Sequence, residues 1–218
     1  MNILLKKVNK LSMKKIQFKF HKDKVKIFEV GIGDLFCCKS LNYWNQDGFD
    51  ITLFEPNPFL YKNILTKIEN IKNIKLHNIG ISNEQKIGEL VCAGVLSYLK
   101  DIPSPINTIY FNQLNNIFEK FTLPVKLMKF NSFDNGDIDY LILGMEGAEF
   151  TVFENIISRP HIINIHNYFA NDYNYNFPNF ERIADWSKEN RYNMVSIFPD
   201  ILLINSESIR NNTISIYE

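Results

Sequence analysis

Short apolar segments separated by helical patterns dominate the sequence between residues 25 and 82. Strand-like runs lie at Val25–Val30, 51–54 and 73–82, and helical patterns follow the first two, at 34–44 and Pro58–Ile68. Proline suits the first turn of a helix, because its missing N–H has no partner there in any case. Consecutive strands joined by helices pair in parallel, so this alternation predicts a parallel sheet with both faces covered.

Further strand patterns follow at 88–95, 125–130, 137–143 and 161–166, with helical patterns at 107–118, from Glu146 and at 180–190. Residues 192–205 read as two strands joined by Pro199-Asp200, which predicts a hairpin. We therefore predict an α/β fold, a doubly wound, mostly parallel seven-stranded sheet with a C-terminal antiparallel hairpin. That plan is typical of Rossmann-like class I methyltransferases. It would occupy 25–218, with an insertion around 88–130, after a basic N-terminal extension at 1–24.

Lysines are concentrated at the N-terminus. Residues 1–26 hold nine lysines against one aspartate, although the formal net charge of the chain is zero. Such a segment is either a solvated extension or a weak contact for a membrane or another acidic surface. No apolar run approaches the roughly 20 residues of a membrane span, and no signal-peptide pattern is present. The three cysteines form no disulfide framework, so we expect a cytoplasmic protein with reduced thiols.

Two glycines and an acid stand where the first strand ends, in Glu29-Val30-Gly31-Ile32-Gly33. Glycines at the carboxyl end of a strand let the backbone approach a ligand closely, although they also serve a tight turn. Glu55 ends the next strand, and a carboxylate in that place can accept hydrogen bonds from both hydroxyls of a ribose. Phe36 replaces the third glycine of the dinucleotide fingerprint. The acidic lining instead favours S-adenosylmethionine, which carries a sulfonium cation and no phosphate.

Four segments together resemble the FkbM family of S-adenosylmethionine-dependent methyltransferases. They are Glu29–Gly33, "LFEPNPFLYKNI" (53–64), "NIGIS" (78–82) and "DIDYLILGMEGAEFTVFENI" (137–156), and the likeness extends over 25–205. The resemblance implies O-methylation, often of sugars in glycans or natural products. It implies S-adenosylmethionine as cofactor and a small-molecule or glycan substrate, with no nucleic acid expected as a partner. The oligomeric state stays open.

The resemblance also implies roles for individual residues. Glu29, Gly31 and Gly33 would surround the methionine part of the cofactor, and Glu55 would bind its ribose. The adenine would lie beside Asn78, Ile79 and Gly80, and Gly144 would face the transferring methyl group. Candidate bases are His166, Glu146 and Glu149, although the two glutamates also suit a helix N-terminus and the histidine a structural role. We expect no metal site.

Two departures from the family pattern leave alternatives open. The family usually has lysine and aspartate where this chain has Ile142 and Gly144, and its fifth strand often ends in an acid near a histidine, whereas this chain has Asn164 before His166. A fold kept without catalysis is one alternative, and a nucleic-acid methyltransferase anchored by the lysines is another. An NAD-dependent reductase is a third, which the hairpin disfavours. The aromatic-rich segment 167–180 is either a loop that covers a substrate or a packed loop whose aromatic side chains cover the edge of the sheet.

Overall fold

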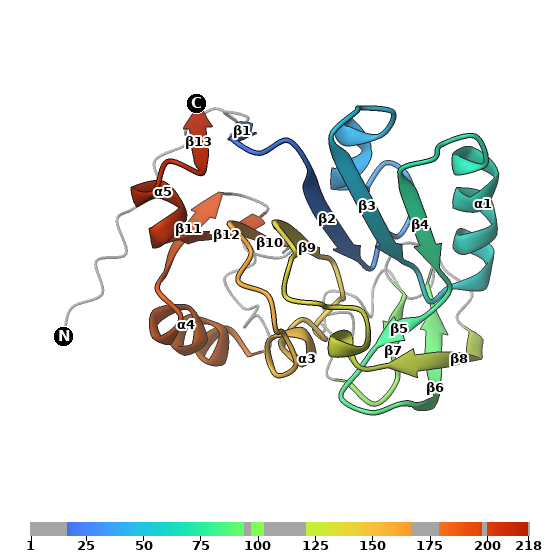
Figure 1. The fold of residues 1–218 in the computed structure, drawn as a ribbon. Helices are drawn as coiled ribbons and strands as arrows, with labels where there is room; N and C mark the ends of the chain where they lie inside the picture. The colour runs from blue at the N-terminus through green and yellow to red at the C-terminus, as the bar shows by residue number, and fades with distance from the viewer. Residues whose placement is uncertain (1–16, 94–96, 103–120, 167–178, 198–199, 218) are drawn as a thin grey trace.

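The computed structural model describes residues 17–93, 97–102, 121–166, 179–197 and 200–217, which form an α/β fold (Figure 1). The main sheet has seven strands in the spatial order β11-β12-β10-β9-β2-β3-β4. The chain order reverses at β2, because β3 and β9 lie on its two sides. The strands are β2 (Val25–Val30), β3 (Phe49–Phe54), β4 (Ile74–His77), β9 (Tyr140–Leu143), β10 (Ile162–His166), β11 (Tyr192–Ile197) and β12 (Asp200–Asn205).

The main sheet is mixed. Four of its six strand pairs are parallel, and the two pairs that involve β12 are antiparallel. The predicted hairpin is present as β11 and β12, but Asp200, predicted to lie in the turn, is the first residue of β12 and pairs with Ile197. On its other side β12 pairs with β10, which places Asp200 opposite His166. The predicted α/β class is confirmed, and the antiparallel β12 between β10 and β11 makes the sheet mixed.

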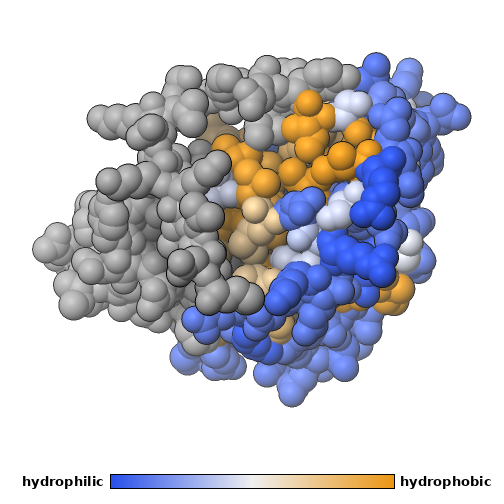
Figure 2. Space-filling view, turned by 90° about the vertical axis from the view of Figure 1, so that its left-hand side faces the viewer, coloured by the Kyte–Doolittle hydropathy of each residue, from blue (hydrophilic) through white to orange (hydrophobic). Residues whose placement is uncertain are grey.

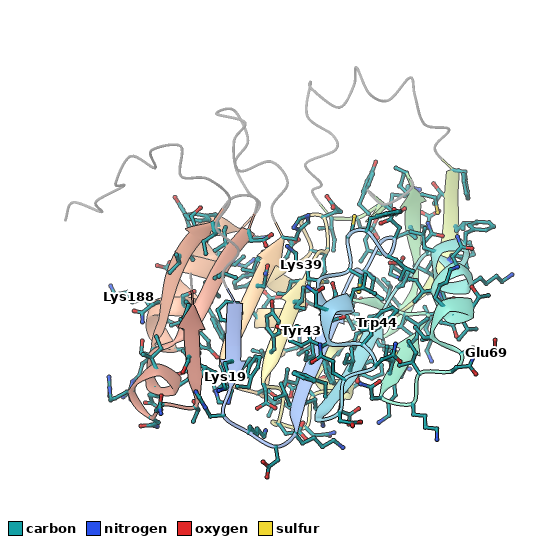
Figure 3. The ribbon with its side chains drawn as sticks, turned by 90° about the horizontal axis from the view of Figure 1, so that it is seen from above. Lys19, Lys39, Tyr43, Trp44, Glu69 and Lys188 are labelled. Atoms are coloured by element: carbon teal, nitrogen blue, oxygen red, sulfur yellow. The ribbon has the colours of Figure 1, made fainter. Side chains whose placement is uncertain are left out.

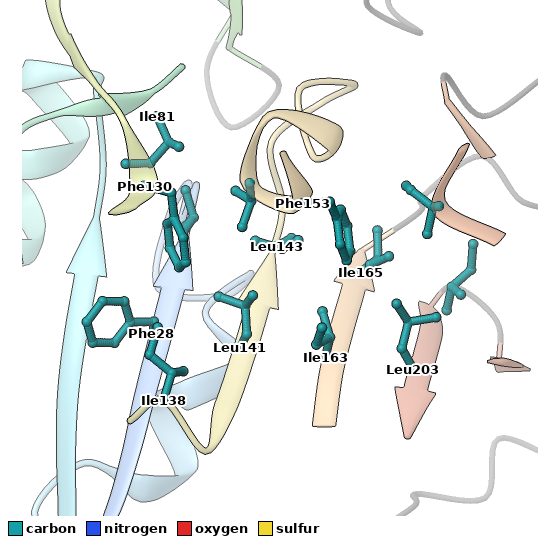
Figure 4. Close-up of a cluster of buried hydrophobic side chains, with 14 of the residues drawn as sticks. Phe28, Ile81, Phe130, Ile138, Leu141, Leu143, Phe153, Ile163, Ile165 and Leu203 are labelled. Atoms are coloured by element: carbon teal, nitrogen blue, oxygen red, sulfur yellow. The ribbon is translucent and has the colours of Figure 1, made fainter. Parts of the chain in front are cut away.

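Buried apolar side chains cover both faces of the main sheet, as the alternation of side chains along each strand requires. Phe28 and Leu141 belong to one face, where α3 and α4 pack (Figure 4). Ile27 and Ile142 belong to the other face, where η1 and α1 pack. The carboxyl ends of the strands are therefore held in place by a hydrophobic core on each face of the sheet. These elements are η1 (Lys39–Tyr43), α1 (Pro58–Ile68), α3 (Phe150–Phe153) and α4 (Phe180–Glu189).

Two smaller sheets flank the main one. A four-stranded sheet with the order β5-β8-β6-β7 occupies the region predicted as an insertion, and η3 follows it. In the second sheet β1 pairs with β13, so the described end of the lysine-rich segment is joined to the last strand. The elements are β1 (Gln17–Phe20), β5 (Gly80–Ile81), β6 (Lys86–Cys92), β7 (Tyr98–Leu99), β8 (Phe121–Met128), η3 (Phe130–Ser132), α5 (Ser206–Arg210) and β13 (Ile214–Tyr217).

Residues 34–44, predicted as a helix, form turns and the short 3-10 helix η1 instead. The Asp34 carboxylate accepts hydrogen bonds from the backbone N–H groups two and three residues later. The buried Glu29 carboxylate then accepts hydrogen bonds from the N–H groups of Lys39 and Ser40. Both carboxylates thus engage N–H groups that a continuous helix would donate to its own carbonyls, and side chains that compete in this way interrupt helices.

Two other predicted elements differ from the structure. The helix predicted from Glu146 begins later, as α3, because Glu146 and Gly147 have φ of +51° and +104°, which a right-handed helix excludes. The strand predicted over 73–82 is divided between β4 and β5. It breaks at Asn78, whose side chain turns back to donate hydrogen bonds to the carbonyls of Glu55 and Pro56.

Some predictions lie outside the described residues. They are the helix at 107–118, most of the aromatic loop at 167–180 and the lysine-rich segment up to residue 16. Within the described part of the chain, no helix is long and apolar enough to cross a membrane. Figure 2 views the molecule from the left-hand side of Figure 1; apolar residues gather in the upper middle of this face, with hydrophilic residues to their right and below.

Candidate functional site

Two adjoining pockets lie where β2, β3 and β9 end. The Glu55 pocket encloses about 500 Å³ and the His166 pocket about 380 Å³, part of it open to solvent. Gly31, Gly33 and Gly144 line both pockets. Ligands of open α/β sheets bind at this edge, where the strand order reverses. Further lining residues are Ile79, Gly80, Leu90, Tyr98 and Leu99 in the Glu55 pocket, and Glu29, Cys37, Lys39 and Glu146 in the His166 pocket.

Gly31 and Gly144 pack backbone against backbone at the floor of both pockets. Gly31 has φ of +76°, and its N–H donates to the Phe54 carbonyl at 2.9 Å. The Gly144 N–H donates to the Val30 carbonyl, also at 2.9 Å. A Cβ on Gly31 would lie 2.1 Å from the Gly144 carbonyl oxygen, and a Cβ on Gly144 would lie 2.9 Å from the Gly31 carbonyl oxygen. This close approach requires both glycines and keeps the floor free of side chains.

Alanine at Gly31 is expected to lower the free energy of unfolding by about 3 kcal/mol or more. A left-handed conformation alone costs a residue with a side chain about 1–2 kcal/mol, and the clash with Gly144 adds about 1–3 kcal/mol. Gly136→Ala is the matched control, because Gly136 has φ of +83° but its Cβ would meet nothing closer than 3.6 Å. Urea denaturation measures both losses, and equal losses would contradict the close packing at Gly31.

Glu55 enters its pocket at the end of β3 as a buried carboxylate, only 3% exposed. Its Oε2 accepts a hydrogen bond from the Gly33 N–H at 2.9 Å, and its Oε1 accepts one from the Asn57 N–H at 2.8 Å. Burial raises the pKa of Glu55 to about 7, although both hydrogen bonds act in the opposite direction. Each carboxylate oxygen has two lone-pair positions. Glu55 can therefore accept two further hydrogen bonds, one on each oxygen.

In the turn predicted to lie beside the adenine, two residues line the pocket and the third binds the backbone of a neighbouring turn. Ile79 and Gly80 line the Glu55 pocket. The Asn78 side chain donates hydrogen bonds to the carbonyls of Glu55 at 2.8 Å and Pro56 at 3.1 Å. Asn78 thus holds the turn that follows β3 and thereby fixes the position of Glu55.

The four-stranded sheet supplies a wall of the Glu55 pocket that our sequence analysis did not anticipate. Leu90 of β6 and Leu99 of β7 face each other in register, and both line the pocket together with Tyr98. The Asn57 side chain at the start of α1 donates a hydrogen bond to the Ser97 hydroxyl at 3.3 Å, which ties this wall to the main sheet. Small-molecule sites are lined mostly by such apolar and aromatic side chains.

Glu29 lines the His166 pocket and holds the loop that closes it. Its carboxylate is 2% exposed and accepts hydrogen bonds from the N–H groups of Lys39 at 2.7 Å and Ser40 at 3.0 Å. It also accepts a hydrogen bond from the Cys38 thiol at 3.2 Å. Burial and the Glu29 charge raise the pKa of Cys38 well above its usual range, so this thiol stays protonated. The role of Glu29 in the structure is to fix the segment that carries Lys39.

Glu149 holds the loop after β9. Its carboxylate is 1% exposed and accepts hydrogen bonds from the N–H groups of Met145 and Gly147, each at 3.1 Å. Burial raises the pKa of Glu149, although these hydrogen bonds lower it in part. Glu149 stands at the N-cap of α3, but its side chain makes no hydrogen bond to that helix and instead accepts from N–H groups of the preceding loop.

Glu146 lines the His166 pocket, and no hydrogen bond or ion pair joins its carboxyl group to the described residues. Burial and the neighbouring charge of Glu149 raise the pKa of Glu146 to about 8. At neutral pH its carboxyl group is therefore mostly protonated and able to donate a hydrogen bond. The left-handed φ of +51° is a strained conformation for a residue with a side chain, and such strain gathers at functional sites.

His166 ends β10 beside a network of polar groups. Its Nδ1 lies 2.8 Å from Asp200 Oδ1. Lys39 Nζ donates to both oxygens of the Asp200 carboxylate, at 2.6 and 2.5 Å, and Asn164 Nδ2 donates to Oδ2 at 3.3 Å. Lys39, the first residue of η1, is labelled in Figure 3. Burial would raise the pKa of Asp200, but the hydrogen bond with His166 and the charge of Lys39 outweigh it and lower the pKa.

Sequence analysis did not identify Asp200 or Lys39 as site residues. The signal for Asp200 was its place in the hairpin turn, because the antiparallel register carries it to the end of β10. Within the described residues, no group of three or more histidine, cysteine, aspartate or glutamate side chains is arranged to hold a metal ion.

Residues 29–194 match the family model of the methyltransferase FkbM domain. The chain belongs to the FkbM methyltransferase family. The resemblance found in the sequence is thereby confirmed. Membership implies S-adenosylmethionine as the cofactor. No curated protein matches the chain.

The solved structure of one FkbM methyltransferase shares this fold. Methyltransferase FkbM from Methylobacillus flagellatus KT is 12% identical with a TM-score of 0.51, and the match covers 84% of this chain but 44% of the other. This FkbM chain thus spans less than half of that protein. An S-adenosylmethionine-dependent methyltransferase from Aquifex aeolicus is 10% identical (84% and 81% covered, TM-score 0.40). Precorrin-6y C5,15-methyltransferase from Geobacter metallireducens GS-15 is 12% identical (85% and 82% covered, TM-score 0.41).

Proposed function

We propose that this FkbM protein methylates a hydroxyl group of a sugar or glycan precursor, with His166 as the general base. The observation that carries the proposal is the meeting of the two pockets at Gly31 and Gly144. One pocket holds a buried carboxylate with free lone pairs, and the other holds a histidine. A nucleoside-type cofactor in the first pocket would thus adjoin a proton acceptor in the second.

The residues of the Glu55 pocket fit the nucleoside part of S-adenosylmethionine. The two oxygens of Glu55 are fixed by the N–H groups of Gly33 and Asn57 and can each accept a ribose hydroxyl. Leu90, Tyr98 and Leu99 offer the apolar surface that suits a flat base. Gly31 and Gly33 line this pocket without side chains, so the backbone can approach a ligand closely.

The chemistry requires one proton acceptor. When bound, S-adenosylmethionine supplies a methyl group whose S–C bond breaks as the O–C bond of the acceptor forms, with the electron pair left on sulfur. His166 takes the proton of the acceptor hydroxyl, a role that contributes roughly 10²- to 10⁴-fold to rate in enzymes. Glu146, protonated at neutral pH, donates a hydrogen bond to a neighbouring oxygen of the acceptor. The Lys39 loop bounds the pocket on the other side.

Gly144 supports an active enzyme over a fold kept without catalysis. The family usually has aspartate at this position, and the absence of that aspartate is the feature that favours a protein without catalytic activity. A side chain on Gly144 would begin 2.9 Å from the Gly31 carbonyl oxygen. The glycine is thus a requirement of the close approach of β2 and β9, and the polar groups of the His166 pocket are retained on β10 and β12.

Binding of S-adenosylhomocysteine is expected to weaken below pH 7, by up to about tenfold per pH unit. Burial raises the pKa of Glu55 to about 7, so the carboxylate that accepts the ribose hydroxyls becomes protonated as the pH falls. By the same linkage, the unliganded protein loses stability as the pH rises from the unfolded pKa of Glu55 toward 7. Calorimetric titration between pH 5.5 and 7.5 tests this, because Glu146, with a pKa of about 8, stays mostly protonated there.

The acceptor class is tested by methyl transfer to a panel of free sugars, nucleotide sugars, RNA and DNA, with S-adenosylmethionine labelled in its methyl group. We expect label on a carbohydrate hydroxyl, and less label, by roughly tenfold or more, with the Glu55→Ala variant at subsaturating cofactor. Label on nucleic acid alone would contradict the sugar acceptor. Cofactor binding without transfer to any acceptor would favour a binding protein over an enzyme.

A further inference from the structure

Asp200 is held at the edge of the His166 pocket by strand pairing. It is the first residue of β12, and the antiparallel register with β10 sets it directly opposite His166. Its side chain is 18% exposed and that of His166 is 14% exposed. Among the described residues, the side chains of Lys39, Asn164 and His166 contact the carboxylate, and Lys39 Nζ and Asn164 Nδ2 both donate to it.

We infer that Asp200 is a positioning residue that holds His166 with its proton on Nδ1 and so leaves Nε2 as the proton acceptor. The inference rests on the proposed function, in which His166 is the base. An ionised carboxylate only accepts hydrogen bonds, so the Nδ1 atom 2.8 Å away must carry the hydrogen. The Lys39 ammonium keeps Asp200 ionised, in line with the lowered pKa of that carboxyl group. Similar carboxylate–imidazole pairs fix the tautomer in hydrolytic triads.

The Asp200→Asn variant provides a sharp test, because the amide of asparagine has one oxygen that accepts hydrogen bonds and one NH₂ group that donates them. Lys39 and the Asn164 amide both donate, so they draw the carbonyl oxygen of the new amide toward themselves. The amide NH₂ is then left facing His166 Nδ1 and can only donate. The imidazole must accept at Nδ1 and move its proton to Nε2, which is the wrong tautomer for a base.

Other titratable groups line the same pocket and could in principle influence the tautomer of His166. Glu29, from β2, is engaged by the N–H groups of η1. Glu146, from the loop after β9, is protonated at neutral pH through burial and the charge of Glu149. Cys37 also lines the pocket. In the described part of the chain, Asp200 is the acid that hydrogen-bonds to the His166 ring, so the tautomer is assigned to it.

The experiment is ¹⁵N NMR of the full chain labelled in its histidine rings, recorded at pH 8 with and without S-adenosylhomocysteine. His166→Gln assigns the His166 signals among the four histidines. We expect neutral His166 to carry its proton on Nδ1 in the wild type and on Nε2 in Asp200→Asn. Asp139→Asn is the control, because Asp139 lies 3.5 Å from Nε2 of His161, and it should leave the His166 signals unchanged.

A wild-type spectrum with the His166 proton on Nε2 overturns the inference without any variant, and so does a tautomer that Asp200→Asn leaves unchanged in a folded protein. Retained binding of S-adenosylhomocysteine by Asp200→Asn, with methyl transfer reduced at least tenfold, supports it. Failure of the wild type to bind S-adenosylhomocysteine would instead sink the proposed function, whatever the tautomer of His166.

Discussion

The His166→Ala variant is expected to lose methyl transfer by roughly 10²- to 10⁴-fold, the range that a general base contributes. His166 ends β10 inside the pocket that meets the Glu55 pocket at Gly31 and Gly144, and Asp200 fixes its ring. The imidazole lies outside the Glu55 pocket, so the dissociation constant of S-adenosylhomocysteine should change less than threefold. Initial rates with the acceptor identified from the panel, and calorimetry with S-adenosylhomocysteine, measure the two effects.

His21→Ala is the matched control for this variant. His21 is exposed and its ring contacts Ser215 between β1 and β13, away from both pockets. Its replacement should leave rate and affinity unchanged. A His166→Ala enzyme that retains more than a tenth of the wild-type rate would exclude His166 as the base and turn attention to Glu146.

The second large effect is expected for Glu55→Ala, which should weaken S-adenosylhomocysteine binding by roughly 10- to 100-fold. Hydrogen bonds to a charged group contribute about 1.5–3 kcal/mol, and each 1.4 kcal/mol is a factor of ten in affinity. Glu55→Gln should also bind weakly. An amide can accept from only one of the two N–H groups, those of Gly33 and Asn57, that both contact the carboxylate now.

Glu69→Ala is the control for charge, since Glu69 is an exposed glutamate that follows α1, at the periphery in Figure 3. Its affinity should equal that of the wild type. Far-ultraviolet circular dichroism shows whether each variant remains folded. Equal affinity of folded Glu55→Ala and wild type would place the ribose elsewhere.

Much of the fold could be predicted because most strands coincide with short apolar segments that are bounded by polar or turn-forming residues. The run at 137–143 and the hairpin at 192–205 gave correct elements from local patterns alone. The helix predicted at 34–44 was wrong for a reason that no local pattern contains. Glu29, five residues before that segment, captures its backbone N–H groups after folding. Long-range capture of this kind depends on burial of the carboxylate, which the sequence does not state.

The site was predictable in part. Glu55 and the glycines at 31 and 33 stand at strand ends, so their positions follow from topology, and the structure brings them to one edge. Asp200 lies 34 residues from His166 and meets it only through the register of β12 with β10. Leu90 and Leu99 reach the Glu55 pocket from a separate sheet. Such contacts require pairings between strands that periodicity along one strand does not determine.

The most direct test of the account is calorimetric titration of the wild-type chain with S-adenosylhomocysteine at pH 8, where Glu55 is largely ionised. We expect S-adenosylhomocysteine to bind with micromolar affinity at one site per chain, in the pocket that Gly31, Glu55 and Leu99 line. Absence of binding at millimolar ligand would contradict it, because both the cofactor and the chemistry proposed at His166 depend on that pocket.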